Sequence, residues 1–282
     1  MRRSFHYIIA FLVSWSTLGV SIEESVCNAA PPSSPVYSID FRGIKFDNDN
    51  MRLFGSGTSQ FVKPTKEGLA ISAPKDKQVK ELGFGPKFTL RGDFEITAGF
   101  EISKLDDPDA GYGVGPSLYL ATNSPAEDAA TVARLKRIKE GDVFSTHSAT
   151  NVAQPDGKPK RQHSVKMFDT AAMTGRLRLV RAGKTLRYLV SEGGPEADFR
   201  ELQQLEFTDA DVTLVRVSIN RNGAGTPAEM RWLDFTVTAK AFIGKSQSRA
   251  AVVVSMWPWV AMASGLVLLA VVVWLWRRRM TG

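Results

Sequence analysis

Cysteine is almost absent from the chain, which has one, Cys27, among its 282 residues. A single cysteine excludes an intrachain disulfide framework and a zinc site built from thiolates. Histidine is also scarce: of the three, His147 and His163 have no histidine or cysteine neighbour at the spacing of zinc ligands. The sequence therefore predicts a protein without a tightly bound cofactor.

Charge of one sign is in excess, but little of the excess belongs to the middle of the chain. The net charge is +7, and arginines 277–279 supply three of these charges. The arginines at 2–3 are balanced by the glutamates at 23–24, which leaves +4 for residues 30–249. So weak and dispersed an excess does not favour a nucleic-acid partner. The hydrophobic content of 43% is enough for a core and excludes global disorder.

Residues 1–29 have the pattern of a secretory signal peptide. A basic Met-Arg-Arg start precedes an apolar run at 7–20, which is too short to span a ~30 Å hydrocarbon core. Cys27 and Ala29 then provide small residues for cleavage. An uncleaved N-terminal anchor is the alternative.

The C-terminal end has the pattern of a transmembrane helix over 250–276. This stretch has no charged residue, and its span from Trp257 to Trp276 corresponds to about 30 Å of helix. Tryptophan favours both membrane interfaces, and arginines 277–279 fit the positive-inside rule. A processed surface-sorting signal and a buried globular helix are the alternatives. We expect a short linker at 244–249 and a basic cytoplasmic tail at 277–282.

These two ends predict a single-pass protein of the cytoplasmic (inner) membrane. Residues 30–243 would lie on the exported, periplasmic or extracytoplasmic side, which argues further against a nucleic-acid partner. The C-terminal helix makes the membrane itself the first expected partner.

The middle of the chain alternates apolar and polar residues with the period of a β-strand. The clearest run, 93–104, places five apolar residues on one face: Phe94, Ile96, Ala98, Phe100 and Ile102. Residues 175–191 predict a hairpin that turns at Gly183. Further strands are expected at 36–41, 68–73, 116–122, 142–149, 163–168, 200–207, 214–219 and 232–239. Only 126–140 has a helix-like composition, and a helix, a loop and an edge strand all fit it. The pattern predicts an all-β fold, a single large sandwich over 30–243.

Several motifs carry a resemblance to a known superfamily. The run at 178–195, Arg-Leu-Val-Arg-Ala-Gly-Lys-Thr-Leu-Arg-Tyr-Leu-Val-Ser-Glu-Gly-Gly-Pro, with 199–202 and 209–212, resembles the concanavalin A-like lectin and glucanase superfamily. The segments at 39–43 and 67–71 resemble an uncharacterised family of exported planctomycete proteins. The resemblance implies a two-sheet jelly-roll ectodomain of the kind used to bind or cleave glycans, and it implies no particular activity.

Acidic residues do not form a recognisable catalytic pattern. Glycosidases need two carboxyl groups about 5–9.5 Å apart, and the superfamily's Glu-x-Asp-x-x-Glu and Glu-x-Asp-x-Glu patterns are missing. Glu95 and Glu101 share a strand face but lie about 20 Å apart. Asp209 and Asp211 fit solvated turn acids better than a catalytic pair. Enzyme activity is therefore not expected, although carboxylates from separate strands remain an alternative.

Aromatic residues provide the candidate ligand site. Alternation places Trp232 and Asp234 opposite Leu233 and Phe235, so the indole ring would lie on an open face and stack on a sugar. The alternative is that a loop covers Trp232 in a second small core. Two more candidate ligand-binding residues are Tyr119 and Tyr188.

A calcium site is a weaker hypothesis, on the acidic loop with Asp106, Asp107 and Asp109. The segment at 47–50, Asp-Asn-Asp-Asn, is a second candidate, and turn-forming side chains are the alternative for both. The basic stretches at 134–139 and 158–161 fit solvated faces better than a polyanion site.

The sequence thus favours a non-catalytic, membrane-anchored, lectin-like domain for a glycan or another surface ligand. A glycan-processing hydrolase and a structural subunit of an envelope complex, bound to another envelope protein, are the alternatives.

Overall fold

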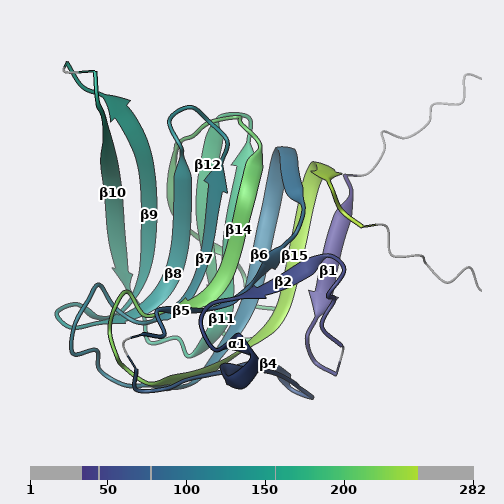
Figure 1. Ribbon diagram of the computed structural model, residues 1–282, viewed down its shortest axis with the longest axis vertical. Coiled ribbons are helices and arrows are strands. Elements are labelled where there is room, and N and C mark those ends of the chain that lie inside the picture. Colours follow the sequence, from purple (N-terminus) through teal and green to yellow (C-terminus); the bar gives the residue numbers. More distant parts are fainter. Residues whose placement is uncertain (1–33, 44, 77, 156, 247–282) are drawn as a thin grey trace, which may run out of the picture. The chain divides into compact units, whose positions relative to one another are not determined.

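The computed structural model describes residues 34–246 except positions 44, 77 and 156 (Figure 1). The predicted signal peptide, the helix at 250–276 and the tail at 277–282 lie outside the described residues. Within the described part, no helix has the length and apolar character needed to cross a membrane.

The described chain is an antiparallel β-sandwich with one short helix, α1 (Thr58–Phe61). The front layer in Figure 1 has the strand order β10-β9-β8-β7-β14-β5-β2. Its strands are β2 (Met51–Phe54), β5 (Glu81–Pro86), β7 (Gly115–Thr122), β8 (Ala129–Arg137), β9 (Gly141–Ala153), β10 (Pro159–Asp169) and β14 (Val212–Asn220).

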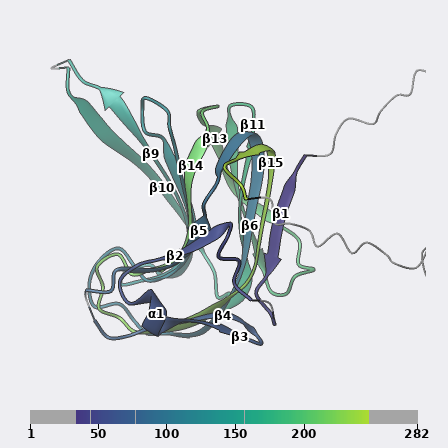
Figure 2. The ribbon, with the colours of Figure 1, turned by 45° about the vertical axis from the view of Figure 1, so that its right-hand side comes forward.

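The back layer has the order β13-β12-β11-β6-β15, and both β1 and β4 pair with β15. Its strands are β1 (Val36–Asp40), β3 (Val62–Thr65), β4 (Gly68–Ala73), β6 (Thr89–Leu105), β11 (Thr174–Ala182), β12 (Thr185–Glu192), β13 (Arg200–Glu206) and β15 (Ala228–Ile243). The two layers are joined through one pairing, between Val212 of β14 and Leu90 of β6. Figure 2 shows the layers from the side.

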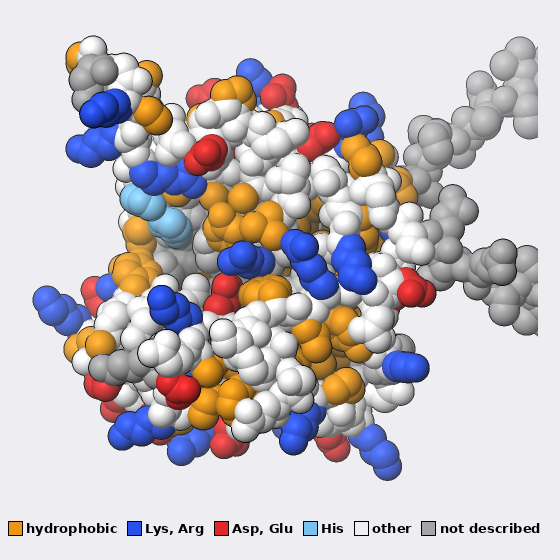
Figure 3. Space-filling model, viewed as in Figure 1, with side chains coloured by type: hydrophobic (Ala, Val, Ile, Leu, Met, Phe, Trp, Pro, Cys, Tyr) orange, Lys and Arg blue, Asp and Glu red, His pale blue; other side chains and the backbone are white. Residues whose placement is uncertain are grey.

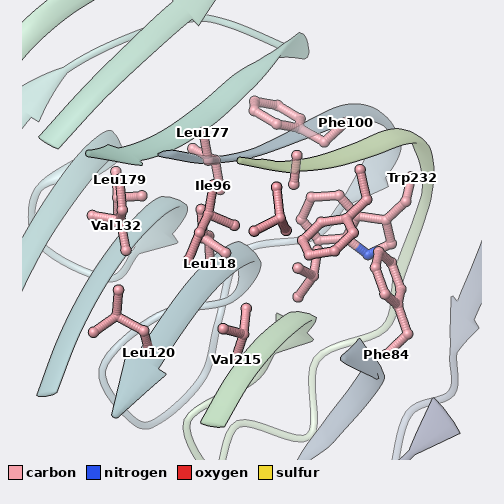
Figure 4. Close-up of a cluster of buried hydrophobic side chains, with 14 of the residues drawn as sticks. Phe84, Ile96, Phe100, Leu118, Leu120, Val132, Leu177, Leu179, Val215 and Trp232 are labelled. Carbon is pink, nitrogen blue, oxygen red and sulfur yellow. The ribbon is translucent and has the colours of Figure 1, made fainter. Parts of the chain in front are cut away.

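The core lies between the layers, as the strand alternation predicts. All five apolar residues expected on one face of β6 are buried. They meet apolar residues of the front layer, among them Leu118, Leu120, Val132 and Val215 (Figure 4). A fully buried side chain of this size contributes roughly 1.5–3 kcal/mol of transfer free energy. The single large sandwich is therefore held by one continuous apolar core.

The predicted hairpin and the ambiguous segment both become strands. β11 and β12 pair as expected, and Gly183 takes a φ of 57° at their turn. The helix-like segment at 126–140 contains β8, which pairs with β7 and β9. Between two strands, the ladder hydrogen bonds and the burial of Val132 outweigh a modest helix preference.

The expected orientation of Trp232 is wrong, because β15 contains a β-bulge. Its pairing with β6 shifts register between Trp232 and Asp234. A bulge adds one residue to a strand and so reverses the alternation beyond it. Both Trp232 and Phe235 consequently face the core, whereas Leu233 is only half-buried. The indole ring has no exposure and packs edge-on to Phe84, with ring centroids 6.1 Å apart (Figure 4).

Candidate functional site

The front layer carries a hollow on its outer face, away from the core (Figure 3). Its volume is about 490 Å3, and side chains from five neighbouring strands contribute to it. The lining residues are Tyr112, Ser117, Tyr119, Thr131, Ala133, Leu135, Ser145, His147, His163, Val165, Asn220 and Asn222. Histidine side chains, pale blue in Figure 3, lie on one flank of it.

Strand alternation explains how these side chains are gathered. In β7, Leu118 and Leu120 are buried in the core, so Ser117 and Tyr119 point to the opposite face. In β8, Val132 likewise faces the core while its neighbours line the hollow. Because the strands are hydrogen-bonded in register, hydroxyl-bearing residues of adjacent strands meet.

A second hollow of about 290 Å3 adjoins the first and extends it across β14. The two share four residues, Ser117, Tyr119, Thr131 and Asn220. We call the two hollows together the groove. Its lining is rich in hydroxyl and amide groups, which donate and accept hydrogen bonds without carrying charge.

Tyrosines form the aromatic walls of the groove. Tyr119 is half-buried, and this burial raises the pKa of its hydroxyl, so the group stays protonated at neutral pH. Tyr112 rests on a small apolar cluster that includes Leu135, and the Arg137 guanidinium lies 4.0 Å from its ring centroid. The Tyr112 hydroxyl is buried without a hydrogen-bond partner among the described residues. The Tyr112 ring is therefore held by packing against this cluster and by the Arg137 guanidinium.

A histidine pair closes one flank of the groove. The Nε2 of His147 lies 2.9 Å from the Nδ1 of His163, and the two rings are stacked with centroids 5.1 Å apart. Burial lowers the pKa of His147, and the nearby His163 and Arg161 lower it further. His147 is therefore neutral at pH 7 and offers hydrogen bonds rather than charge.

The described groove lining contains one carboxylate, Glu81. It accepts hydrogen bonds from the Ser218 hydroxyl at 2.8 Å and from the Arg216 guanidinium at 3.2 Å. The Arg216 guanidinium also lies over the ring of Phe54, 5.2 Å from its centroid. Hydrolysis of a glycosidic bond by the common mechanism needs two carboxyl groups facing the bond, and the groove lining supplies one.

Of the four predicted ligand-binding residues, Tyr119 lies in the groove. Tyr188 is fully buried in the back layer, and its hydroxyl donates a hydrogen bond to the backbone oxygen of His147 at 3.2 Å. Its burial raises the pKa of that hydroxyl well above the usual value. Tyr188 thus supports β9 from beneath and does not face the groove.

Asp234 and Trp232 belong to the back layer instead. Only 9% of Asp234 is exposed, and its carboxylate accepts a hydrogen bond from Arg176 at 3.0 Å. This ion pair sits on the outer face of the sandwich, across the core from the groove. Trp232 and Asp234 are therefore not part of the groove that Tyr119 lines.

The calcium hypothesis for Asp106, Asp107 and Asp109 is not supported either. No group of three acidic, histidine or cysteine side chains suited to a metal occurs among the described residues. Asp107 pairs with Lys136 at 2.6 Å and Asp106 with Lys104 at 3.5 Å, so their oxygens face lysine ammonium groups. In the second segment, Asp47 accepts backbone hydrogen bonds from the next residues, as a turn-forming aspartate does.

The sequence reading missed most of the groove. His147 and His163 lack the spacing of zinc ligands in the sequence, and their pairing across β9 and β10 cannot be deduced from that spacing. A signal was nevertheless present: Ser117 and Tyr119 alternate with leucines, so one face of that strand is polar and aromatic.

The architecture defines a class: an antiparallel jelly-roll sandwich with a polar and aromatic groove on one outer face. The family described as "Protein of unknown function (DUF1583) C domain" matches residues 18–255, and the chain belongs to this family. Its antiparallel jelly-roll fold is shared by solved structures of other proteins. None of the curated proteins compared with the chain matches it.

Solved structures share this fold at low sequence identity. One structure comes from work on endo-acting O-glycanases that prominent members of the human gut microbiota express. It is 15% identical to this chain, with a TM-score of 0.51, and the alignment covers 73% of this chain and 99% of that structure's chain. A GH43 protein from Bacillus licheniformis is 13% identical, has a TM-score of 0.50, and aligns over 72% of this chain and 39% of its own. A legume lectin-like domain from Entamoeba histolytica is 12% identical, with a TM-score of 0.45, over 67% of this chain and 90% of its own.

Proposed function

We propose that the groove binds a segment of a carbohydrate chain and does not cleave it. The observation that carries the proposal is the setting of Tyr119, which lines both hollows among hydroxyl and amide groups, with the Glu81–Arg216 ion pair beside it in the second hollow. An aromatic ring favours the apolar face of a sugar ring, and the surrounding groups match its hydroxyls. Two solved structures of the same fold are described as a glycanase and a GH43 protein, which supports a carbohydrate-related role.

Binding without cleavage is favoured by the charges of the groove. Glu81 is tied to Arg216 and Ser218, so it stabilises the groove rather than facing a second acid. The neutral His147 ring beside His163 also suits hydrogen bonding to a neutral sugar. A ligand of this kind gains affinity from ring contact and several hydrogen bonds, each modest in strength.

The test uses the purified full chain on a glycan array, followed by calorimetry with the glycans that bind. We expect Tyr119→Ala to weaken binding by about tenfold or more, because the stacking surface is lost. Tyr119→Phe keeps the ring and is the matched control, with affinity close to that of the unchanged protein. Absence of any glycan ligand, or equal binding by Tyr119→Ala, would overturn the proposal.

The same glycans are then incubated with the chain and analysed for products. We expect none. Release of shortened glycans that stops in Glu81→Gln would establish the hydrolase alternative instead, with Glu81 as one of its acids.

We further propose that the groove is displayed on the exported side of the cytoplasmic membrane, anchored by residues 250–276. The support is the uncharged stretch framed by tryptophans and followed by arginines 277–279. In spheroplasts of an expressing bacterium, added protease should digest the sandwich, while a tag placed after residue 282 should be spared. A tag that is digested, or a chain found in the soluble fraction, would contradict this topology.

A further inference from the structure

β10 forms a free edge of the front layer. It is paired with β9 on one side over eleven residues without a register shift, and no described strand pairs with its other side. Side chains from Gln162 to Lys166 are exposed on both faces of the sheet. Figures 1 and 2 both show the β9–β10 hairpin extending beyond the other strands.

Two backbone hydrogen bonds at opposite ends of the β9–β10 hairpin show which backbone groups of β10 point toward the free edge. The Gln154 N–H donates to the Lys158 oxygen at 3.3 Å, and the Thr170 N–H donates to the Asp142 oxygen at 3.1 Å. In an antiparallel pair, residues bonded to the partner strand alternate with residues whose N–H and C=O point away. The backbone N–H and C=O groups of the even-numbered residues of β10 thus point toward β9. The outward backbone groups belong to Arg161, His163, Val165, Met167 and Asp169.

The edge is positively charged. Between Pro159 and Phe168, β10 has Lys160, Arg161 and Lys166 and no acidic residue. Neither of these lysines forms an ion pair with a described residue. The Arg161 guanidinium donates to neutral acceptors, including the Glu127 backbone oxygen at 2.6 Å, so its charge is not neutralised there.

There is also room beside the edge. A hollow of about 640 Å3 separates the inner face of the hairpin from β13, and Gln162 and Ser164 line it opposite Gln203. In a sandwich these inner positions would ordinarily be apolar and packed on the other layer. Here they are polar and open, so side chains of an added strand have space on that side, in a hollow whose lining also includes Asp128, Glu206, Asp209 and Lys184.

We propose that β10 binds an extended, acidic segment of a partner protein, which adds to the front layer as a further strand. The outward N–H and C=O groups supply backbone hydrogen bonds, and the three cations select acidic side chains. A second copy of this chain is a poorer occupant, because two β10 strands would bring their cations together. This inference does not rest on glycan binding by the groove.

The test measures amide hydrogen exchange of the full chain, residue by residue. The probe is a synthetic peptide of about twelve residues that alternates glutamate and threonine, and its lysine–threonine counterpart is the control. We expect the acidic peptide to slow exchange about tenfold at His163, Val165 and Met167, and to change Ser164 little. The basic peptide should protect none of them.

Two variants separate strand addition from general charge attraction. Val165→Pro removes one outward N–H, which an edge strand tolerates, and should weaken peptide binding about tenfold. Val165→Thr keeps the N–H and should bind normally. The double variant Lys160→Glu and Lys166→Glu should transfer preference to the basic peptide, and it provides a test even if the proline variant does not fold.

Three results would overturn the proposal. The first is that the acidic peptide does not bind, as expected if the lysines merely protect the edge from pairing. The second is protection at the even-numbered amides, or none, despite binding. The third is a dimer in sedimentation that Val165→Pro dissociates, which would assign the edge to a second copy.

Discussion

Trp232 is enclosed by the core, yet its indole N–H has no hydrogen-bond partner among the described residues. Its contribution to stability therefore comes from packing. We expect Trp232→Ala to lower the free energy of unfolding by about 3–5 kcal/mol, because it leaves a large cavity. Trp232→Phe should cost much less, since it keeps an aromatic ring beside Phe84 and removes an unsatisfied donor. Urea unfolding of both variants measures this. An equal decrease in the free energy of unfolding of the two variants would contradict a packing role for Trp232.

His147 makes the stability of the fold depend on pH. Its pKa is lowered in the folded state, mainly by burial and then by His163 and Arg161. A lowered histidine pKa means that the unfolded chain binds more protons as pH falls through its ordinary value of about 6.5. The stability contribution is thus present above that value and is lost as pH falls toward the folded pKa.

We therefore expect the unfolding midpoint in urea to fall between about pH 7.5 and pH 5, and His147→Gln to reduce that slope. Lys63→Gln, on an exposed site in β3, is the control and should leave the slope unchanged. A steeper slope in His147→Gln would show that the sign is wrong.

At the scale of elements, close strand contacts depend on particular glycines. A Cβ at Gly175 in β11 would lie 2.2 Å from the Ser191 backbone oxygen of β12. At Gly194, beyond the hairpin, a Cβ would meet nothing within 4 Å. We expect Gly175→Ala to destabilise the protein by about 1–3 kcal/mol, and Gly194→Ala to be neutral or slightly stabilising. Thermal unfolding measures both, and similar melting temperatures would argue against the close approach.

Elements with regular alternation were predictable from the sequence, and irregular ones were not. The buried face of β6 and the β11–β12 hairpin follow from period two and from Gly183. Short strands such as β2, β3 and β5 were missed, since four to six residues give too little pattern. The bulge in β15 leaves no local signal, so Trp232 was assigned to the wrong face.

The groove was less predictable, because it joins residues far apart in the chain. Tyr119 could be named, since an aromatic on the polar face of a strand is visible in the sequence. Its neighbours Asn220 and His163 reach the groove through strand order, with β14 inserted beside β7 and β10 beyond β9. Non-local strand order of this kind is not encoded in local periodicity.

At the scale of the whole molecule, Arg181 links β11 to the neighbouring strand β6 and to the loop between β13 and β14. Its fully buried guanidinium donates to the backbone oxygens of Thr208 at 3.1 Å, Ala210 at 2.5 Å and Gly92 at 2.5 Å. We expect Arg181→Leu to cost about 3 kcal/mol or more, because three carbonyls lose their donor. Arg91→Leu, which removes an exposed ion pair with Asp211, should cost under about 1 kcal/mol. Denaturant titration measures the free energy of unfolding of both variants. An equal decrease in the two variants would contradict a stabilising role for the Arg181 hydrogen bonds.

The position of β15 also sets the order in which the molecule is completed. The last described strand, β15, pairs with β6, β4 and β1, so the back layer is complete only after the fourteen other described strands have been synthesised. Until then β1 has no partner, and closing so long a loop carries a large entropic cost. A chain that still lacks β15 therefore cannot complete the back layer. Sandwiches with such non-local pairing typically fold in roughly milliseconds to seconds.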